Sequence, residues 1–329
     1  MRVGILSFAH VHAEGYAEVL RGLPGVELVG FCDPDDARAG RFARVYGLRR
    51  YGSAEALLAE GLDAVAVTSE NALHRPLVEA AARAGTAVLV EKPIATTVED
   101  ALAMRRAVEA AGVPFMTAFP MRFSPAVRAA RAMILEDRIG PVRALVGVNH
   151  SENPRRHRAW FADPELAGGG AVMDHTVHLA DLYRWFLGEE VAEVYAEISN
   201  PFDPEVEVDT AGLLSLRMAG GASASIDASW SRPAHYPRWG HLQIEAVGER
   251  GTLVLDAFAG HLHGWTAGGY RWLGYHPDPA RAMWQAFLTS VREEREPPVT
   301  WRDGFEATRV VLAAYRSARE GRPVAPAEL

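Results

Sequence analysis

Cysteine, lysine and long apolar runs are scarce in this chain of 329 residues. The single cysteine, Cys32, excludes an internal disulfide and a zinc site built from cysteines. No apolar run approaches the roughly 18 residues of a membrane-spanning helix, and residues 1–7 resemble a strand and a turn rather than a signal peptide. We therefore expect a cytoplasmic protein that does not contact a membrane.

Positive charge is outweighed by negative charge, because the formal net charge is -8 at pH 7. This balance gives no general attraction for nucleic acid, so we expect no nucleic-acid partner. The hydrophobic share of 49% and the charged share of 23% are ordinary for globular proteins and exclude disorder, collagen and coiled coil. At this length we expect two domains that act on a small molecule.

Lysine occurs only once. Lysine and arginine together number 34, and Lys92 is the only lysine. A composition that uses arginine wherever the two are interchangeable keeps lysine where a compact ammonium with adjustable protonation is needed, because a guanidinium stays charged. Lys92 is therefore the first candidate for chemistry, and chance survival on a solvated surface is the alternative.

The first 120 residues alternate short β-branched runs with amphipathic helical patterns, which is typical of a doubly wound parallel sheet. Strands are expected at 3–7, 26–32, 63–68, 87–90 and 114–118, and helices at 13–21, 35–46, 54–59, 73–84 and 98–111. Glycines at 47, 61, 85 and 112 suit helix C-caps. Residues 1–121 are therefore predicted to form a Rossmann-like domain.

The rhythm changes after a helical run at 124–135, because alternating strands predominate from 141 to about 273. Clear strands lie at 208–218, 222–230, 241–247 and 252–256, and two helices at 279–294 and 304–319 close the chain. The predicted class is thus α/β, an N-terminal doubly wound parallel sheet with a second α+β domain on a largely antiparallel open sheet. We place this substrate and oligomerisation domain at 122–329, with closing helices that can pack back on the first domain.

The first predicted strand leads into a loop where a dinucleotide-binding fold carries the GxGxxG motif. The loop consists of Ser7, Phe8, Ala9, His10, Val11 and His12, so all three glycines are missing. Small Ser7 and Ala9 can approximate the first two glycines, whereas His12 departs from the third. Because the loop keeps its place in the βαβ pattern, we predict that these six residues contact a dinucleotide.

Asp33 supports this assignment. It follows the second predicted strand, where an acidic side chain accepts from a ribose 2′-hydroxyl and repels a 2′-phosphate. Asp33 therefore favours NAD, with NADP the less suitable cofactor. The alternative role for Asp33 is a helix N-cap.

His10 and His12 are potential metal ligands by residue type. Alternation would turn both side chains to one side only in an extended strand, and a loop is expected here. We therefore predict no metal site.

Two further segments narrow the class of protein. Glu91-Lys92-Pro93 directly follows a predicted strand, and residues 168–181 read GGGAVMDHTVHLAD. With these segments the chain resembles the Gfo/Idh/MocA family of NAD(P)-dependent oxidoreductases, in which a strand ends in EKP and the second domain carries GGGxxxDxxxH. Similar segments occur at 69–74, 122–125, 209–210, 248–253 and 317–324. The departures are the glycine-poor loop, Ser69-Glu70 in place of Thr-Pro, and Thr176 where glycine is common.

The resemblance implies cofactor-binding residues beyond the loop. They are Asp33, Ser69, Asn71, His74, Glu91 and Lys92. Lys92 is expected at a strand carboxyl end, which is the edge where an open α/β sheet binds its ligand. Pro93 keeps the backbone of Lys92 extended, so that the lysine side chain projects from the end of the strand.

A predicted helix after Gly170 carries Asp174 and His178 four residues apart, so both side chains share one face, and Asp181 follows three residues later. His178 is the best candidate for proton transfer, because an imidazole with a pKa of about 6.5 titrates near the usual working pH. Asp174 either holds a substrate hydroxyl or orients the imidazole. The alternative is a pair that merely caps and hydrogen-bonds the helix.

We predict that Lys92, Asp174 and His178 are catalytic and that both domains contribute to one cleft. Substrate contacts are expected from the same three residues together with Arg122 and Trp160. The Trp160 ring either stacks on a sugar or packs internally. The basic run 155–158 either clamps a charged substrate group or is solvated, and solvation is favoured.

As the resemblance implies, the expected reaction is hydride transfer between NAD and a secondary alcohol of a sugar, cyclitol or related polyol. His178 takes the hydroxyl proton, Lys92 stabilises the developing alkoxide, and Asp174 holds the substrate. Two alternatives stay open: an NAD-dependent glycoside hydrolase without net redox change, and a non-catalytic NAD-binding regulator of the same fold. Relatives cover an open sheet by pairing, so a homodimer or homotetramer is expected.

Overall fold

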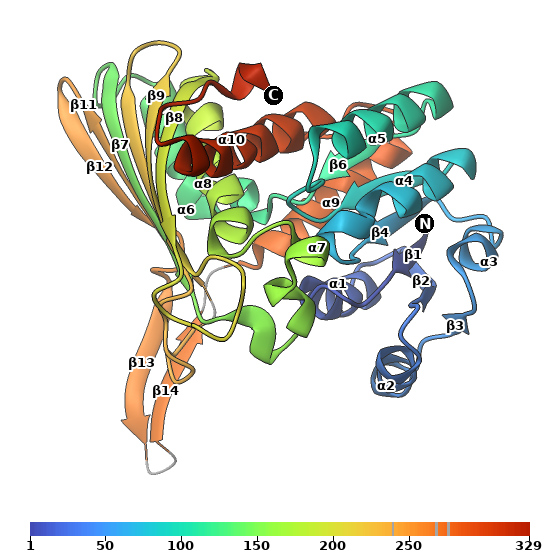
Figure 1. Cartoon of the computed structure of the whole chain (residues 1–329). Helices are drawn as coiled ribbons and strands as arrows, with labels where there is room; N and C mark the ends of the chain where they lie inside the picture. The colour runs from blue at the N-terminus through green and yellow to red at the C-terminus, as the bar shows by residue number, and fades with distance from the viewer. Residues whose placement is uncertain (239, 267–268, 275–276) are drawn as a thin grey trace. The chain divides into compact units, whose positions relative to one another are not determined.

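The computed structural model describes residues 1–238, 240–266, 269–274 and 277–329. These residues form two compact units (Figure 1). The first unit comprises Met1–Pro120, Glu165–Gly168 and Ala280–Phe305, and the second comprises Met121–Pro164, Gly169–Pro279 and Glu306–Leu329. The carboxyl-terminal part of the chain therefore contributes to both units.

A six-stranded parallel sheet forms the centre of the first unit. Its strands are β1 (Arg2–Leu6), β2 (Glu27–Cys32), β3 (Arg50–Tyr51), β4 (Ala64–Val67), β5 (Ala87–Val90) and β6 (Phe115–Thr117). The order β3-β2-β1-β4-β5-β6, with parallel pairing throughout, confirms the predicted doubly wound class. The sequence does not predict β3, because two residues are too few to show a period.

Helices flank this sheet close to their predicted positions. They are α1 (His12–Arg21), α2 (Asp36–Tyr46), α3 (Ala54–Leu58), the 3-10 turn η1 (Asn71–Leu73), α4 (His74–Arg83), α5 (Val98–Ala111) and α9 (Pro279–Arg292). The side chains of Asp35, Ser53 and Thr97 accept hydrogen bonds from first-turn amides and begin α2, α3 and α5. The predicted C-caps Gly47 and Gly112 are left-handed. Helices α4 and α5 lie side by side (Figure 1).

The central strands are buried along their whole length. Every residue of β4 and β5 is buried, and their sequences AVAV and AVLV lack a polar alternation, as expected for parallel strands covered on both faces. At the end of β1, Phe8 packs edge-on against Phe31 with ring centroids 4.9 Å apart and stacks on Phe42 at 4.6 Å. This aromatic packing anchors the loop that leaves β1.

A mixed sheet dominates the second unit, in the order β12-β11-β7-β10-β9-β8. Its strands are β7 (Val142–Ser151), β8 (Val191–Ser199), β9 (Ala211–Met218), β10 (Ser223–Ser229), β11 (Gly240–Gly248) and β12 (Gly251–Asp256). Strands β7 and β10 are parallel and the other neighbours antiparallel, which confirms the predicted, largely antiparallel sheet. A hairpin of β13 (His261–Thr266) and β14 (Gly269–Gly274) follows.

One face of the second sheet is covered by α8 (Ala171–Leu187), which packs on β7 and β10 (Figure 1). The other helices and turns are η2 (Pro120–Phe123), α6 (Pro125–Leu135), η3 (Pro154–Arg156), η4 (Ala159–Ala162), α7 (Pro164–Ala167), α10 (Trp301–Glu320) and η5 (Pro326–Glu328). The opposite face of the sheet exposes Val146, Leu213 and Val254. Among the described helices, none has the length and apolar character needed to cross a membrane.

The single thiol is protected by the fold. Cys32 ends β2 and is buried, and burial raises the pKa of its thiol to about 12. Because the thiolate is the reacting form, we expect the native protein to resist iodoacetamide at about pH 8 and the unfolded chain to gain one adduct. Mass spectrometry counts the adducts, and rapid alkylation of the folded chain would contradict this burial.

Candidate active site

The loop from β1 to α1 makes its turn without glycine. Ser7 has a φ of 76°, in the left-handed region that glycine normally occupies. Its hydroxyl donates to Oδ2 of Asp33 at 3.3 Å and accepts from the amide of Ala9 at 3.1 Å. The amide of Phe8 donates to the same Asp33 oxygen at 2.6 Å. Ser7, supported by Asp33, therefore replaces the turn-forming part of the missing glycine motif.

The rest of the loop is hydrogen-bonded to Thr68, which directly follows the neighbouring strand β4. The amide of His10 donates to the carbonyl of Thr68 at 2.9 Å, and the Thr68 hydroxyl donates to the carbonyl of Ser7 at 2.6 Å. Ala9 and His10 are buried, whereas Val11 and His12 are partly exposed. The side chain of Phe8 is fully buried in the core, and the cofactor contact expected of Phe8 stays a prediction.

Asp33 lies at the carboxyl end of β2, and the N-cap of α2 is Asp35, so the capping alternative for Asp33 is wrong. Oδ1 of Asp33 accepts from the Asp35 amide at 2.9 Å, and Oδ2 accepts from Nε of Arg38 at 2.9 Å. Arg38 also faces a carboxylate oxygen of Glu70 at 3.5 Å. The sequence analysis missed Arg38, because an arginine in the first turn of a helix gives no sign of where it points.

Ser69, Asn71 and His74 lie together after β4, and all three are buried. The Asn71 amide nitrogen donates to the carbonyl of Ala167 at 2.9 Å, and Nδ1 of His74 lies 3.1 Å from the carbonyl of Ile94. Burial lowers the pKa of the His74 imidazole below its usual range. The His74 side chain is fully buried and contacts the segment after β5. Its expected contact with the cofactor stays a prediction.

Glu91 and Lys92 follow β5 directly, as predicted. Glu91 is fully buried, and its carboxylate contacts Nδ1 of His12 at 3.1 Å and accepts from the Tyr16 hydroxyl at 2.5 Å. Burial raises the pKa of Glu91, but His12, His10 and Lys92 together leave it below its usual range. Lys92 is 3% exposed, and its bond to Pro93 is cis.

Asp174 and His178 form one polar patch on α8. Within residues 171–180 these two are partly exposed and the other eight are buried. The Asp174 carboxylate lies 3.5 Å from the indole nitrogen of Trp230 and 3.8 Å from Nδ1 of His175. The predicted shared face is thus present, and Trp230, which sequence reasoning missed, is its neighbour from the end of β10.

The glycines before α8 allow close approach of two supporting side chains. A Cβ on Gly170 would lie 1.8 Å from the carbonyl oxygen of Asp209, and one on Gly169 would lie 2.1 Å from the Tyr315 hydroxyl. The Asp209 carboxylate accepts from the amides of Gly170 and Val172 at 2.9 and 2.8 Å, and from Tyr315 at 2.6 Å. Burial raises the pKa of Asp209 despite these bonds. Asp209 therefore anchors the amino-terminal end of α8, on which Asp174 and His178 lie.

Arg122 and Trp160 are both buried in the second unit. Nε and Nη2 of Arg122 donate to the two oxygens of Asp181 at 2.8 and 2.5 Å, and its guanidinium lies over Trp185. Trp160 stacks on Phe161 with centroids 4.0 Å apart. Arg122 thus holds α8 through Asp181, and Trp160 packs on Phe161. The substrate contacts expected of both residues stay predictions.

The buried Arg122–Asp181 pair gives a stability prediction. We expect Asp181→Ala to lower the free energy of unfolding of the second unit by about 3–5 kcal/mol, because it leaves a buried guanidinium without its carboxylate. The double variant Arg122→Met/Asp181→Leu should lose less, since no unpaired charge remains. Urea unfolding measures both, and a loss below about 1 kcal/mol for Asp181→Ala would contradict the pairing.

A cavity of about 420 Å³ lies within the second unit. Its lining includes Arg155, Arg156, Trp230 and Arg232. Arg155 is paired with Asp203 at 2.9 Å and with a second carboxylate, so part of the basic run is neutralised rather than simply solvated. Trp230 lines this cavity, and its indole nitrogen also lies near the Asp174 carboxylate.

Two family models match most of the chain. Residues 1–119 match the oxidoreductase family with an NAD-binding Rossmann fold, and residues 127–254 match the GFO/IDH/MocA C-terminal domain. The chain belongs to the GFO/IDH/MocA oxidoreductase family. It is therefore an NAD(P)-dependent oxidoreductase with an NAD-binding domain, and the predicted family, enzyme class and cofactor are confirmed.

Relatives within the GFO/IDH/MocA family are similar over nearly the whole chain. D-apiose dehydrogenase of Paraburkholderia graminis is 32% identical, over 98% of this chain and 87% of that protein. Myo-inositol dehydrogenase Hyg17 of Streptomyces leeuwenhoekii is 31% identical, over 99% and 100%. The crystal structure of a probable dehydrogenase from Thermotoga maritima has a TM-score of 0.86 and 26% identity, and the match covers 100% of this chain and 99% of that one.

Proposed function

We propose that this GFO/IDH/MocA protein is a dehydrogenase of a sugar, a cyclitol or a related polyol. The observation that carries the proposal is the patch of Asp174 and His178 on an otherwise buried stretch of α8. A carboxylate and an imidazole on one face can bind hydroxyl groups and move a proton. Two relatives are named for polyhydroxylated substrates, D-apiose and myo-inositol.

Each of the three residues has a distinct role in the proposed oxidation. His178 accepts the proton of the substrate hydroxyl as the carbon is oxidised to a carbonyl. Lys92 stabilises the negative charge that develops on the oxygen. Asp174 binds a substrate hydroxyl or orients the imidazole. When bound, NAD supplies the acceptor for the hydride from the alcohol carbon.

The residues of the first unit fit a dinucleotide. The loop of Ser7 lies at the carboxyl end of β1 in a doubly wound sheet, and Asp33 directly follows the neighbouring strand β2. Arg38 would suit the 2′-phosphate of NADP if its charge were available. Its guanidinium instead contacts Asp33 at 2.9 Å and Glu70 at 3.5 Å, so two carboxylates offset its charge. We therefore favour NAD over NADP.

A panel of pentoses, hexoses and inositols, each mixed with NAD and purified protein, tests the proposed function. Oxidation of a polyol should accumulate reduced nicotinamide, which is read by its near-ultraviolet absorbance. A glycoside hydrolase would release sugar without that signal, and a regulator would bind NAD and stay silent; the relatives named above support neither. Silence across the panel despite NAD binding would overturn the proposal.

We also propose that the protein forms a homodimer or homotetramer through the open face of the second sheet. Val146, Leu213 and Val254 share that face, and Val254 is 79% exposed. An apolar sheet face is stabilised when a second copy covers it. Light scattering after size-exclusion chromatography measures the mass, and a monomer at micromolar concentration would contradict the pairing.

A further inference from the structure

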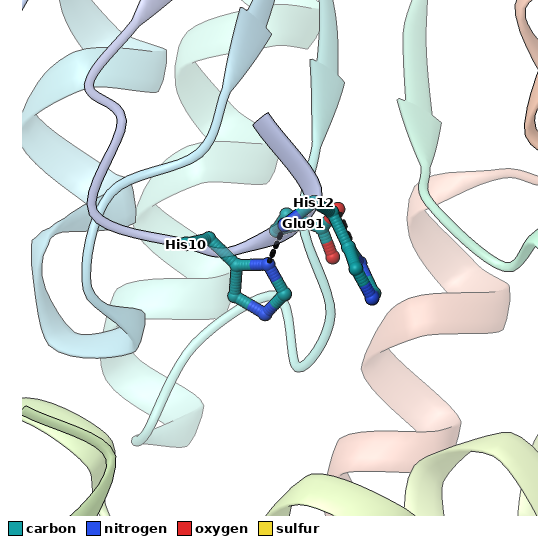
Figure 2. A group of neighbouring side chains, drawn as sticks. All are labelled: His10, His12 and Glu91. Atoms are coloured by element: carbon teal, nitrogen blue, oxygen red, sulfur yellow. Dashed lines mark hydrogen bonds and ion pairs between the residues drawn. The ribbon is translucent and has the colours of Figure 1, made fainter. Parts of the chain in front are cut away.

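Three side chains near the start of α1 form a potential ligand set. His10 lies in the loop after β1, His12 begins α1, and Glu91 follows β5, all within the first unit. One ligand atom from each residue lies within 4.8 Å of the others. Figure 2 shows the two imidazoles and the carboxylate close together, with dashed lines that join His10 to His12 and His12 to Glu91. We infer that His10, His12 and Glu91 bind one divalent transition-metal ion of the zinc or cobalt type.

The donor atoms suit such an ion. Two imidazoles and one carboxylate are nitrogen and oxygen ligands that zinc and its neighbours accept. Nδ1 of His12 lies 3.1 Å from Oε1 of Glu91, close to the separation of about 3.4 Å between two ligand atoms on a tetrahedral zinc with bonds of about 2.1 Å. The His10 ring centroid lies 4.4 Å from that of His12, so rotation of the His10 side chain completes the set.

The carboxylate is already held for this role. The Tyr16 hydroxyl donates to Oε1 of Glu91 at 2.5 Å, and the amide of Lys92 donates to Oε2 at 3.1 Å. Outer hydrogen bonds of this kind orient a ligating carboxylate. The Glu91 side chain is fully buried, and a bound cation would neutralise a charge that water cannot reach.

Metal binding at His10 replaces one existing hydrogen bond. Nδ1 of His10 accepts from the amide of His12 at 3.2 Å, and a neutral imidazole has one acceptor nitrogen. The amide belongs to the first turn of α1, where backbone N–H donors have no partner within the helix. Water readily replaces an acceptor that such a donor loses. The site therefore forms without disruption of the fold.

This site departs from the prediction that the two histidines hold no metal. That prediction assumed that only an extended strand would bring His10 and His12 to one side. Helix α1 begins at His12 and turns the backbone, so the two rings approach each other, and Glu91, 79 residues beyond His12, directly follows β5. The sequence around the two histidines therefore does not indicate Glu91 as the third ligand.

A second histidine pair in the protein provides a matched control. The rings of His150 and His241 lie 5.8 Å apart, and His150 also contacts the carboxylate of Asp227 at 2.9 Å. Between them, however, Nη2 of Arg232 contacts Nδ1 of both rings, at 3.1 and 2.6 Å. A guanidinium at this position repels a metal ion, so this pair should not bind one.

The experiment measures metal binding by the full chain after treatment with EDTA, without NAD or substrate, so its result does not depend on the proposed function. Co²⁺ is titrated into the wild type and into His10→Gln, His12→Gln, Glu91→Gln and the control His241→Gln. We expect one equivalent of Co²⁺, read by its visible absorption, in the wild type and in the control. Each ligand variant should bind about tenfold more weakly or worse.

Thermal unfolding gives a second measurement of metal binding in case one variant is unstable. Added Zn²⁺ should raise the Tm of the wild type and of His241→Gln, because it binds the native state, and should leave Glu91→Gln unshifted. The inference is overturned if the ligand variants bind Co²⁺ as tightly as the wild type, or if His241→Gln removes the spectrum. It is also overturned if the wild type binds no Co²⁺. Weaker binding of inorganic phosphate by His10→Gln and His12→Gln would then assign the imidazoles to an anion.

Discussion

Replacing Lys92 by arginine is expected to lower turnover roughly 10²–10³-fold, the effect of removing one donor that stabilises a developing oxyanion. Lys92 is 3% exposed, so the larger, planar guanidinium must displace neighbouring atoms. It would then no longer present a compact charge to the substrate oxygen. NAD binding should change much less, because the loop after β1 and Asp33 are not altered.

Steady-state kinetics with the substrate found in the polyol panel measures the turnover of Lys92→Arg, and calorimetry measures its NAD affinity. Arg106→Lys is the control, because it exchanges the same two residue types at an exposed position on α5. Its turnover should match that of the wild type. Wild-type turnover in Lys92→Arg would remove the argument that the only lysine of the chain was kept for chemistry.

Replacing His178 by glutamine is expected to lower turnover roughly 10²–10⁴-fold, the usual contribution of a general base. Glutamine keeps a hydrogen-bonding side chain of similar reach but cannot accept the proton at neutral pH. The oxidation rate of the wild type should fall as the pH drops through the range in which an imidazole becomes protonated. In His178→Gln that fall should disappear, because the proposed general base is gone.

The pH profile distinguishes a base from a residue that only positions the substrate. A purely positioning role would raise KM and leave the acidic limb of the profile in place. His157→Gln is the control, because His157 is exposed and pairs with Glu152 at 3.0 Å. A profile of His178→Gln that keeps the wild-type shape would show that another group takes the proton.

Local patterns were sufficient for the elements of the first unit. The strand at 87–90 and the helix at 98–111 coincide with β5 and α5, since a fully apolar run and a capped amphipathic repeat each mark their own ends. The parallel order follows from alternation of strands and helices, because crossover connections leave few arrangements. The two residues of β3 show that very short strands escape such patterns.

Some contacts of the site residues can likewise be read from local spacing, and others cannot. Asp174 and His178 share a face because their spacing equals one helical turn, which can be read directly from the sequence. The buried pairing of Arg122 with Asp181 joins residues 59 apart, and no local pattern distinguishes it from a substrate contact. Ionic partners far apart in the chain are decided by which helix faces pack together.

Residue types and periods thus specified the fold class, the family motifs and the candidate acid–base residues of this protein, because these features depend on spacing along one element. Long-range packing specified what each polar group contacts. It brought Tyr315 to Asp209 across 106 residues beneath α8, and Glu91 to His12 across 79 beside α1. Such contacts arise when separate elements bury their apolar faces against one another. The spacing of residues along the chain does not show which elements pack together in this way.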